Sequence, residues 1–153
     1  MNQTTPEGAI LIEEPGREVG AALAEIIKGH TTPTLTYISD ELIPGYNAYM
    51  EYGWIWEMPE PNPHIHEHVH DYDEFIIHIG TDPHEPTDLG AEIEFVVGGT
   101  TLLITKTSTL FIPKGLKHGP VVWKRVDRPH IQMGIFPTVG DMRKTNVGGY
   151  PVG

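Results

Sequence analysis

The stretch that decides the fold of this chain spans residues 63 to 74 and reads Pro63-His64-Ile65-His66-Glu67-His68-Val69-His70-Asp71-Tyr72-Asp73-Glu74. It places a histidine at every second position, and a carboxylate follows the last of them. Successive side chains of an extended strand point to opposite faces, so one face would carry His64, His66, His68 and His70. Imidazole and carboxylate groups hold divalent metals in proteins, so the stretch predicts a metal-binding strand.

A further histidine follows a later apolar segment, in the stretch Pro113-Lys114-Gly115-Leu116-Lys117-His118. Gly115 permits a sharp bend that aims the following side chains inward. On a strand, His68 and His70 place their Cα atoms about 7 Å apart, which suits neighbouring positions on one metal ion. We therefore expect the intervening chain to bring His118 back to the first histidines.

The composition describes a single globular domain. The chain has 153 residues, of which 39% are hydrophobic and 20% are charged, and this length supports one hydrophobic core. It contains no cysteine, so disulfides and thiolate ligands are excluded, and we expect a cytoplasmic protein without a signal peptide. The formal net charge of −11 argues against nucleic acid or an anionic membrane as a partner. No apolar run approaches the roughly 20 residues that span a bilayer.

Short segments between turn residues predict β-strands over most of the chain. Gly98-Gly99 separates two of these segments and is a strong hairpin signal. One helix is expected over Arg17 to Lys28, where apolar residues recur at helical spacing before Gly29. The pattern is typical of an all-β antiparallel sandwich or barrel with one short N-terminal helix. The expected strands cover residues 34–39, 46–58, 74–79, 91–97, 100–105, 109–113, 119–124 and 130–136.

Three parts of the chain are expected. Residues 1–33 form an N-terminal arm and helix, residues 34–137 form the β-barrel domain, and the glycine-rich residues 138–153 form a C-terminal arm. The apolar patch from Ala9 to Ile12 either pairs with a partner subunit or belongs to a partly ordered tail.

Two motifs of this sequence resemble those of the cupin superfamily. His68-x-His70 followed by Glu74 is similar to the first cupin motif, and Pro113-x-Gly115-x-x-His118 is similar to the second. The resemblance implies an antiparallel jelly-roll (cupin) β-barrel, in which two hairpins bring three histidines and one glutamate to a metal. It also implies one divalent transition metal per chain (Fe, Mn, Zn, Ni or Cu), held by His68, His70, Glu74 and His118.

The sequence departs from the family pattern at three positions, none of which removes a ligand: Gly80, Thr107 and Val122. The register of the histidine run leaves other ligand pairs open, namely His66 with His68, or His64 with His66. The three-residue gap before Glu74 favours His68 and His70.

The two remaining histidines of the run, His66 and His64, are expected toward the rim of the site, where they contact substrate or serve as catalytic acid–base groups. His78 lies between isoleucines and is expected to pack in the core. His130 and Gln132 share one face of the last strand, which looks either into the cavity or toward solvent.

The resemblance implies a homodimeric metal-dependent enzyme of dioxygenase, isomerase or decarboxylase type that acts on a small organic molecule. The alternative is a non-catalytic small-molecule-binding or sensor cupin with a structural metal. A metal buffer that uses the outer histidines is a third possibility. Elemental analysis separates the third from the other two, because a buffer holds several weakly bound ions per chain rather than one tightly bound ion.

Overall fold

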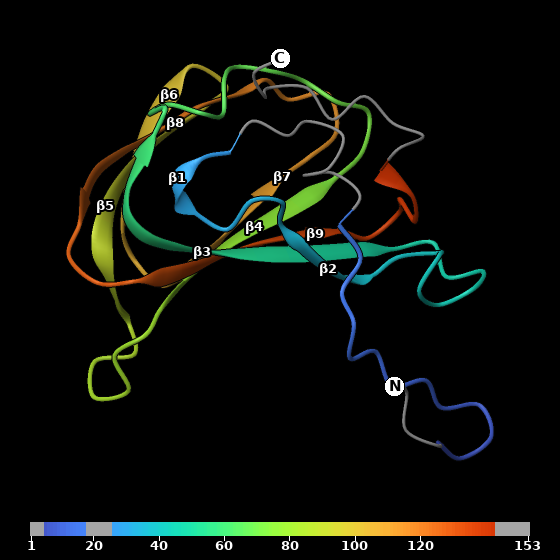
Figure 1. The fold of residues 1–153 in the computed structure, drawn as a ribbon. Helices are drawn as coiled ribbons and strands as arrows, with labels where there is room; N and C mark the ends of the chain where they lie inside the picture. Colours follow the sequence, from blue (N-terminus) through green and yellow to red (C-terminus); the bar gives the residue numbers. More distant parts are fainter. Residues whose placement is uncertain (1–4, 18–25, 143–153) are drawn as a thin grey trace.

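The computed structural model describes residues 5–17 and 26–142, and this part of the chain forms two antiparallel sheets (Figure 1). Its strands are β1 Lys28–His30, β2 Leu35–Ile38, β3 Tyr49–Glu60, β4 Glu74–Gly80, β5 Asp88–Val97, β6 Thr100–Lys106, β7 Ser108–Ile112, β8 His118–Val126 and β9 His130–Phe136. The larger sheet has the order β1-β3-β9-β4-β7, and β2 also pairs with β3. The smaller sheet has the order β6-β5-β8.

The prediction of an all-β antiparallel fold is confirmed, and each strand expected from residue 34 onward has an observed counterpart. The hairpin between β5 and β6 turns at Gly98 and Gly99, whose φ angles are 56° and 81°. Two successive positive φ angles are typical of the type I′ turn, whose twist matches that of the flanking strands, and glycine adopts them without strain. The turn places Val97 opposite Thr100.

The predicted N-terminal helix is not supported. Residues 18–25, which make up most of it, lie outside the described residues, and no α-helix occurs in the described ranges. Lys28 begins strand β1 instead of ending a helix, and it pairs with Glu60 of β3. Pairing with a neighbouring strand therefore overrides the weak local preference of this short segment. Within the same ranges, no helix has the length and apolarity that crossing a membrane requires.

The prediction of a closed barrel is corrected to two separate sheets. In the described part of the chain, the named strands of the two sheets do not pair with one another. The segment that approaches the smaller sheet from the larger one begins with Pro61 and Pro63. Proline has no backbone N–H to donate, so this segment cannot complete a continuous ladder.

The histidine run is not a regular strand, and the prediction that its four histidines line one face is wrong. The segment meets β8 at only two isolated bridges, Ile65 with Val121 and His68 with His118. His64 is buried at 1% exposure, whereas His66 is exposed. The four side chains therefore lie in different environments.

The main apolar core lies largely under the smaller sheet, and a second cluster lies near the start of β3. The first cluster contains Ile55, Leu89, Ala91, Ile93, Phe95, Ile104, Ile112, Val121 and Trp123. The second contains Tyr49, Tyr72, Phe136 and Met142. The candidate site described next lies between the two sheets, with Glu74 of β4 on one side and His118 of β8 on the other.

Candidate metal centre

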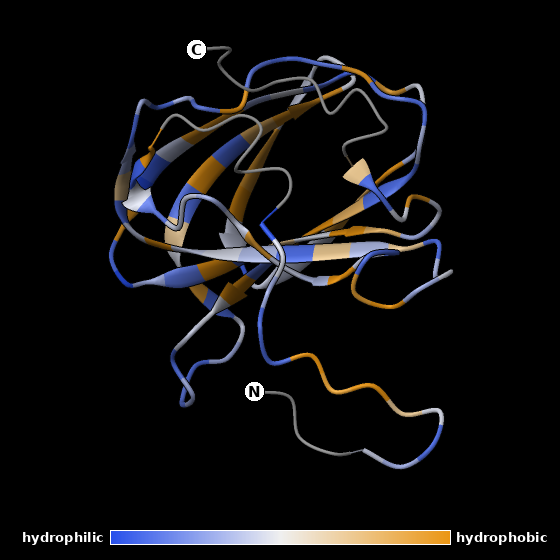
Figure 2. Ribbon diagram, turned by 45° about the vertical axis from the view of Figure 1, so that its right-hand side comes forward, coloured by the Kyte–Doolittle hydropathy of each residue, from blue (hydrophilic) through white to orange (hydrophobic). Residues whose placement is uncertain are grey.

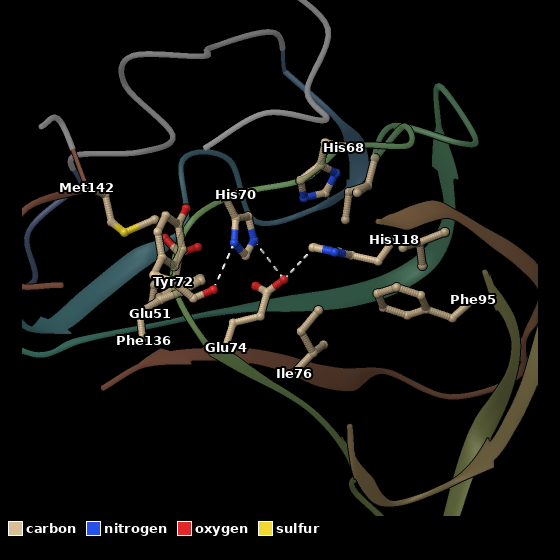
Figure 3. Close-up of a pocket in the computed structure, with 12 residues that line it drawn as sticks. Glu51, His68, His70, Tyr72, Glu74, Ile76, Phe95, His118, Phe136 and Met142 are labelled. Carbon is tan, nitrogen blue, oxygen red and sulfur yellow. Dashed lines mark hydrogen bonds and ion pairs between the residues drawn. The ribbon is translucent and has the colours of Figure 1, made fainter. Parts of the chain in front are cut away.

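The structure brings the four expected ligand side chains together between the two sheets. Each offers one donor atom, and these atoms all lie within 4.8 Å of one another. His68 and His70 come from the loop before β4, Glu74 is the first residue of β4, and His118 is the first residue of β8. Figure 3 shows His70 and His118 reaching the carboxylate of Glu74 from two sides. The exposed fractions of His70, Glu74 and His118 are 7%, 5% and 1%.

The backbone fixes the tautomer of all three imidazoles. In each ring Nδ1 lies within hydrogen-bond distance of a carbonyl oxygen, and a carbonyl can only accept. Nδ1 therefore carries the proton, and the lone pair of Nε2 is left for a metal. The Nδ1–oxygen pairs are His68 with His66 at 2.7 Å, His70 with Tyr72 at 3.1 Å, and His118 with Leu116 at 2.8 Å.

The contacts of Glu74 fit a shared cation. Its Oε1 lies 3.0 Å from His70 Nε2 and 2.6 Å from His118 Nε2. The buried His118 Nε2 nevertheless makes no hydrogen bond of acceptable geometry. Imidazole lone pairs that converge on one carboxylate oxygen form an arrangement that a metal ion completes. Three imidazole nitrogens and one carboxylate oxygen form a donor set for Fe, Mn, Zn, Ni or Cu.

The electrostatics of the site favour the ionised carboxylate. Burial by itself would raise the pKa of Glu74, but contacts with His118 and His70 outweigh burial and lower this pKa to about 2. Burial likewise acts to lower the pKa of His118, but Glu74 and the Leu116 carbonyl raise it above its ordinary value. Glu74 thus favours a positive charge at His118, and a metal ion bound at Nε2 would compete with the proton for this position.

Two cavities meet at this site. The inner cavity has a volume of about 60 Å3 and is bounded by Glu51, the four ligands and a mostly apolar wall of Ile65, Tyr72, Ile76, Phe95, Val121, Phe136 and Met142. The outer hollow has a volume of about 580 Å3 and shares His70 and Tyr72 with the inner one. Its other lining residues are Val69, Asp71, Gly115, Thr138 and Val139.

Comparison with solved structures identifies the fold, although no protein-family model and no curated protein matches the sequence. An RmlC-like cupin from Shewanella frigidimarina is similar over 91% of this chain and 96% of its own, with 16% identity and a TM-score of 0.51. This chain has the cupin fold. The EutQ protein of Clostridium difficile is similar over 86% of this chain and 75% of its own, with 14% identity and a TM-score of 0.47. The polyketide cyclase RemF from Streptomyces resistomycificus is similar over 90% and 80%, with 15% identity and a TM-score of 0.47.

A second carboxyl group, Glu51 of β3, faces the inner cavity and was not predicted from the sequence. It is 8% exposed, and its Oε2 accepts hydrogen bonds from Thr34 Oγ1 at 2.7 Å and from the Tyr49 hydroxyl at 3.4 Å. Burial raises the pKa of Glu51 above its ordinary value despite these two bonds. The sequence carried a signal, because Glu51 lies two residues from both Tyr49 and Gly53 and so shares their inward face on this aromatic strand.

The two histidines expected at the rim do not line the cavity that holds the ligands. His66 contributes its backbone carbonyl to His68, and its side chain is exposed. His64 stacks on Trp123 with ring centroids 5.1 Å apart, and its ring also lies 5.0 Å from that of His30.

His64 belongs to a second group of buried histidines, formed with His30, His78 and His130. Trp123 Nε1 donates to His130 Nε2 at 3.2 Å, and Gln132 Nε2 lies 3.1 Å from His78 Nε2. His78 is thus buried as expected. His130 is also buried, so it does not face solvent, but it does not line the cavity that holds the ligands either. Burial lowers the pKa to about 3 for His64 and His78 and to about 4 for His130.

Proposed function

We propose that this cupin binds one divalent transition metal through His68, His70, Glu74 and His118 and acts on a small organic molecule. The observation that supports the proposal is the convergence of four donor atoms within 4.8 Å, three of them on rings whose tautomer the backbone sets. Four protein ligands leave one or two positions for substrate on an ion that accepts five or six. When bound, the ion supplies Lewis-acid chemistry toward a carbonyl or enolate oxygen.

The two cavities support a substrate with a small reacting end. The inner cavity of about 60 Å3 corresponds to roughly two water molecules, so only a few non-hydrogen atoms fit beside the ligands. The outer hollow of about 580 Å3 has room for the rest of such a molecule, and Tyr72 lies between the two. The apolar wall around Phe95 and Val121 excludes water from the reacting end.

Glu51 is the group best placed to move a proton in this site. It lines the inner cavity with Glu74 but lies on a different strand, and its raised pKa keeps it closer to the protonated form. Two carboxyls whose environments push their pKa values apart commonly divide the roles of acid and charged ligand. We therefore assign the acid–base role to Glu51, and Thr34 and Tyr49 hold its side chain in place.

A non-catalytic cupin with a structural metal is the second candidate. It is favoured by the bridge between His68 and His118, because an ion held by both residues would tie the histidine segment to β8. The small inner volume also suits a site with no substrate. The two candidates differ in whether the ion keeps an open position.

The experiment that tests the proposal is anaerobic purification with elemental analysis, followed by replacement of the metal with Co2+. We expect close to one ion per chain, and a visible spectrum that changes when azide is added to an open position. A Glu51→Gln variant should keep the metal and the azide response, while the pH profile of turnover with candidate substrates changes. A spectrum that azide leaves unchanged favours the structural metal, and absence of a tightly held ion overturns both candidates.

A further inference from the structure

The outer hollow, which has room for the body of a substrate, presents apolar side chains beside a carboxylate. Val69, Tyr72 and Val139 line it, and Val69 is 44% exposed. No described residue of the N-terminal arm lines it. The apolar stretch of that arm, orange in Figure 2, hangs away from the two sheets. The lining of the hollow favours an apolar group over a strongly hydrated one.

The loop beside the hollow, residues 113–116, has no backbone N–H left for an anion. Pro113 has no N–H at all, and the other three N–H groups donate to oxygen atoms of the protein. The pairs are Lys114 with Asp73 Oδ1 at 2.8 Å, Gly115 with the His70 carbonyl at 3.0 Å, and Leu116 with the Pro113 carbonyl at 3.3 Å. Turns that bind anions point several free N–H groups at one position. This loop therefore lacks the donors that would hold a phosphate or a second carboxylate.

The charged side chains around the hollow also disfavour an anionic body. Asp71 lines the hollow and is exposed, whereas none of the described residues that line either cavity is Lys or Arg. Lys114 and Lys117 are exposed and line neither cavity. A carboxylate placed in the hollow would thus face Asp71 without a lining Lys or Arg to offset the repulsion.

The metal end of the site has the opposite preference, because it keeps a positive charge. The three imidazoles would be neutral when Nε2 binds a metal, and Glu74 supplies one negative charge. A divalent ion at these residues would therefore retain one positive charge, which one anionic group of a ligand would offset. Only a few atoms fit beside the ligands, so a second negative charge on the same molecule would lie in the outer hollow, beside Asp71.

We propose that the substrate of this site carries at most one negative charge, on the end that binds the metal, and an uncharged apolar body that lies in the outer hollow. This inference rests on the proposed function and specifies its substrate class. It favours molecules that reach the ion through an enolate, hydroxyl or carbonyl oxygen, and it excludes dicarboxylates and phosphate esters. Asp71 is the residue to which we assign this exclusion.

Two hydroxamates that differ by one carboxylate test the proposal on the Co2+ protein. Benzohydroxamate binds metals through two oxygens and has an uncharged ring, and 4-carboxybenzohydroxamate adds a carboxylate at the far end of that ring. Titration followed by the visible spectrum gives the Kd of each probe. We expect the carboxylated probe to bind ~10-fold more weakly, because its carboxylate would lie beside Asp71. Equal affinity, or tighter binding of the carboxylated probe, overturns the proposal.

A matched pair of variants locates the repulsion. Asp71 is exposed, so Asp71→Asn removes its charge without disturbing a packed side chain, and it should reduce the ratio of the two Kd values by ~3-fold or more. Glu85→Gln removes the same charge from the exposed loop between β4 and β5, at the opposite end of β4 from Glu74 (Figure 1). This control should leave the ratio unchanged. A ratio that responds equally to both variants contradicts the proposal, because the repulsion would then come from the net charge of −11.

The same titrations separate failure of this inference from failure of the proposed function. If azide changes the spectrum but neither hydroxamate does, the metal has an open position but the outer hollow does not accept the body of a ligand. That result overturns the inference alone. If neither azide nor the hydroxamates change the spectrum, the metal is structural, and the proposed function fails together with the inference.

Discussion

The molecule contains two groups of mostly buried histidines, and they differ in what surrounds the rings. The candidate metal group contains His68, His70 and His118. In each ring Nδ1 contacts a backbone carbonyl oxygen, and Nε2 points toward Glu74 or toward the other rings. In the interior group, which contains His64 and His78, the rings pack against one another, Trp123 and Gln132. The two groups have the same residue type, and only His68 among their histidines is partly exposed.

The difference teaches that burial and spacing do not make a histidine a ligand. A ligand needs a fixed tautomer, a lone pair aimed at its neighbours' donor atoms, and a negative charge that offsets the cation. The pKa of His118 is raised by Glu74, whereas burial lowers the pKa of His64 and His78 to about 3. One group is thus arranged to share a positive charge, and the other to remain neutral.

The largest expected effect is a loss of folding stability at low pH, caused by the interior group of histidines. His64, His78 and His130 have folded-state pKa values of about 3, 3 and 4, below the unfolded value of about 6.5. Their contribution to stability is complete above the unfolded pKa and is lost as pH falls toward the folded one. At pH 5, each should lower the free energy of unfolding by about 2 kcal/mol relative to pH 7.

Urea unfolding of the chelator-treated protein at several pH values measures this loss. His64→Phe replaces one ring by an apolar ring of similar size, and it should reduce the slope below pH 6 by up to about 1.4 kcal/mol per pH unit. A slope that is equal in both proteins would mean that His64 is not the neutral, buried group described.

The next largest effect concerns metal affinity. His118→Ala removes one of the four donors and leaves Glu74 with one imidazole contact fewer. The affinity for the metal should therefore fall by about 1000-fold, which is more than the loss of an outer-shell partner produces. His64→Phe is the matched control and should retain one tightly bound ion per chain. Competition with a chelator of known affinity measures both values, and equal affinities would remove the distinction between the two groups.

A smaller effect is the pH dependence of metal binding. His118 must be neutral to bind a metal, and Glu74 raises its pKa. Protons therefore compete for the site as pH falls below that raised pKa, and affinity should decline by about tenfold per pH unit for each proton displaced. Glu74→Gln removes the charge that raises the pKa, so the onset of this decline should move to lower pH even though the overall affinity is weaker. Isothermal titration in buffers of different ionisation enthalpy counts the protons released.

The smallest effect is expected at the histidines outside both groups. His66 uses only its backbone carbonyl, and His84 lies in an exposed loop. His66→Ala and His84→Ala should each change metal affinity by less than about twofold and stability by less than about 0.5 kcal/mol. A large loss of metal in His66→Ala would restore the alternative register in which His66 pairs with His68.

The predictable parts of the fold are those that depend on neighbouring residues in the sequence. The hairpin at Gly98-Gly99 follows from a turn that needs positive φ angles, and β4 and β9 follow from short apolar alternation. Strand β1 was missed because Lys28–His30 is extended only through its pairing with β3. The inward position of Glu51 was readable from its two-residue spacing from Tyr49, but its hydrogen-bond partner Thr34 lies on another segment.

The sequence by itself determined an antiparallel β architecture and a set of imidazole and carboxylate donors, because side-chain alternation, turn glycines and ligand chemistry are local properties. Only the tertiary structure decided which histidines converge and which stay neutral in the interior. That choice depends on the encounter of His118 with Glu74 and on Trp123 stacking over His64. These contacts exist only after the two sheets have packed, since residues far apart in the chain supply them.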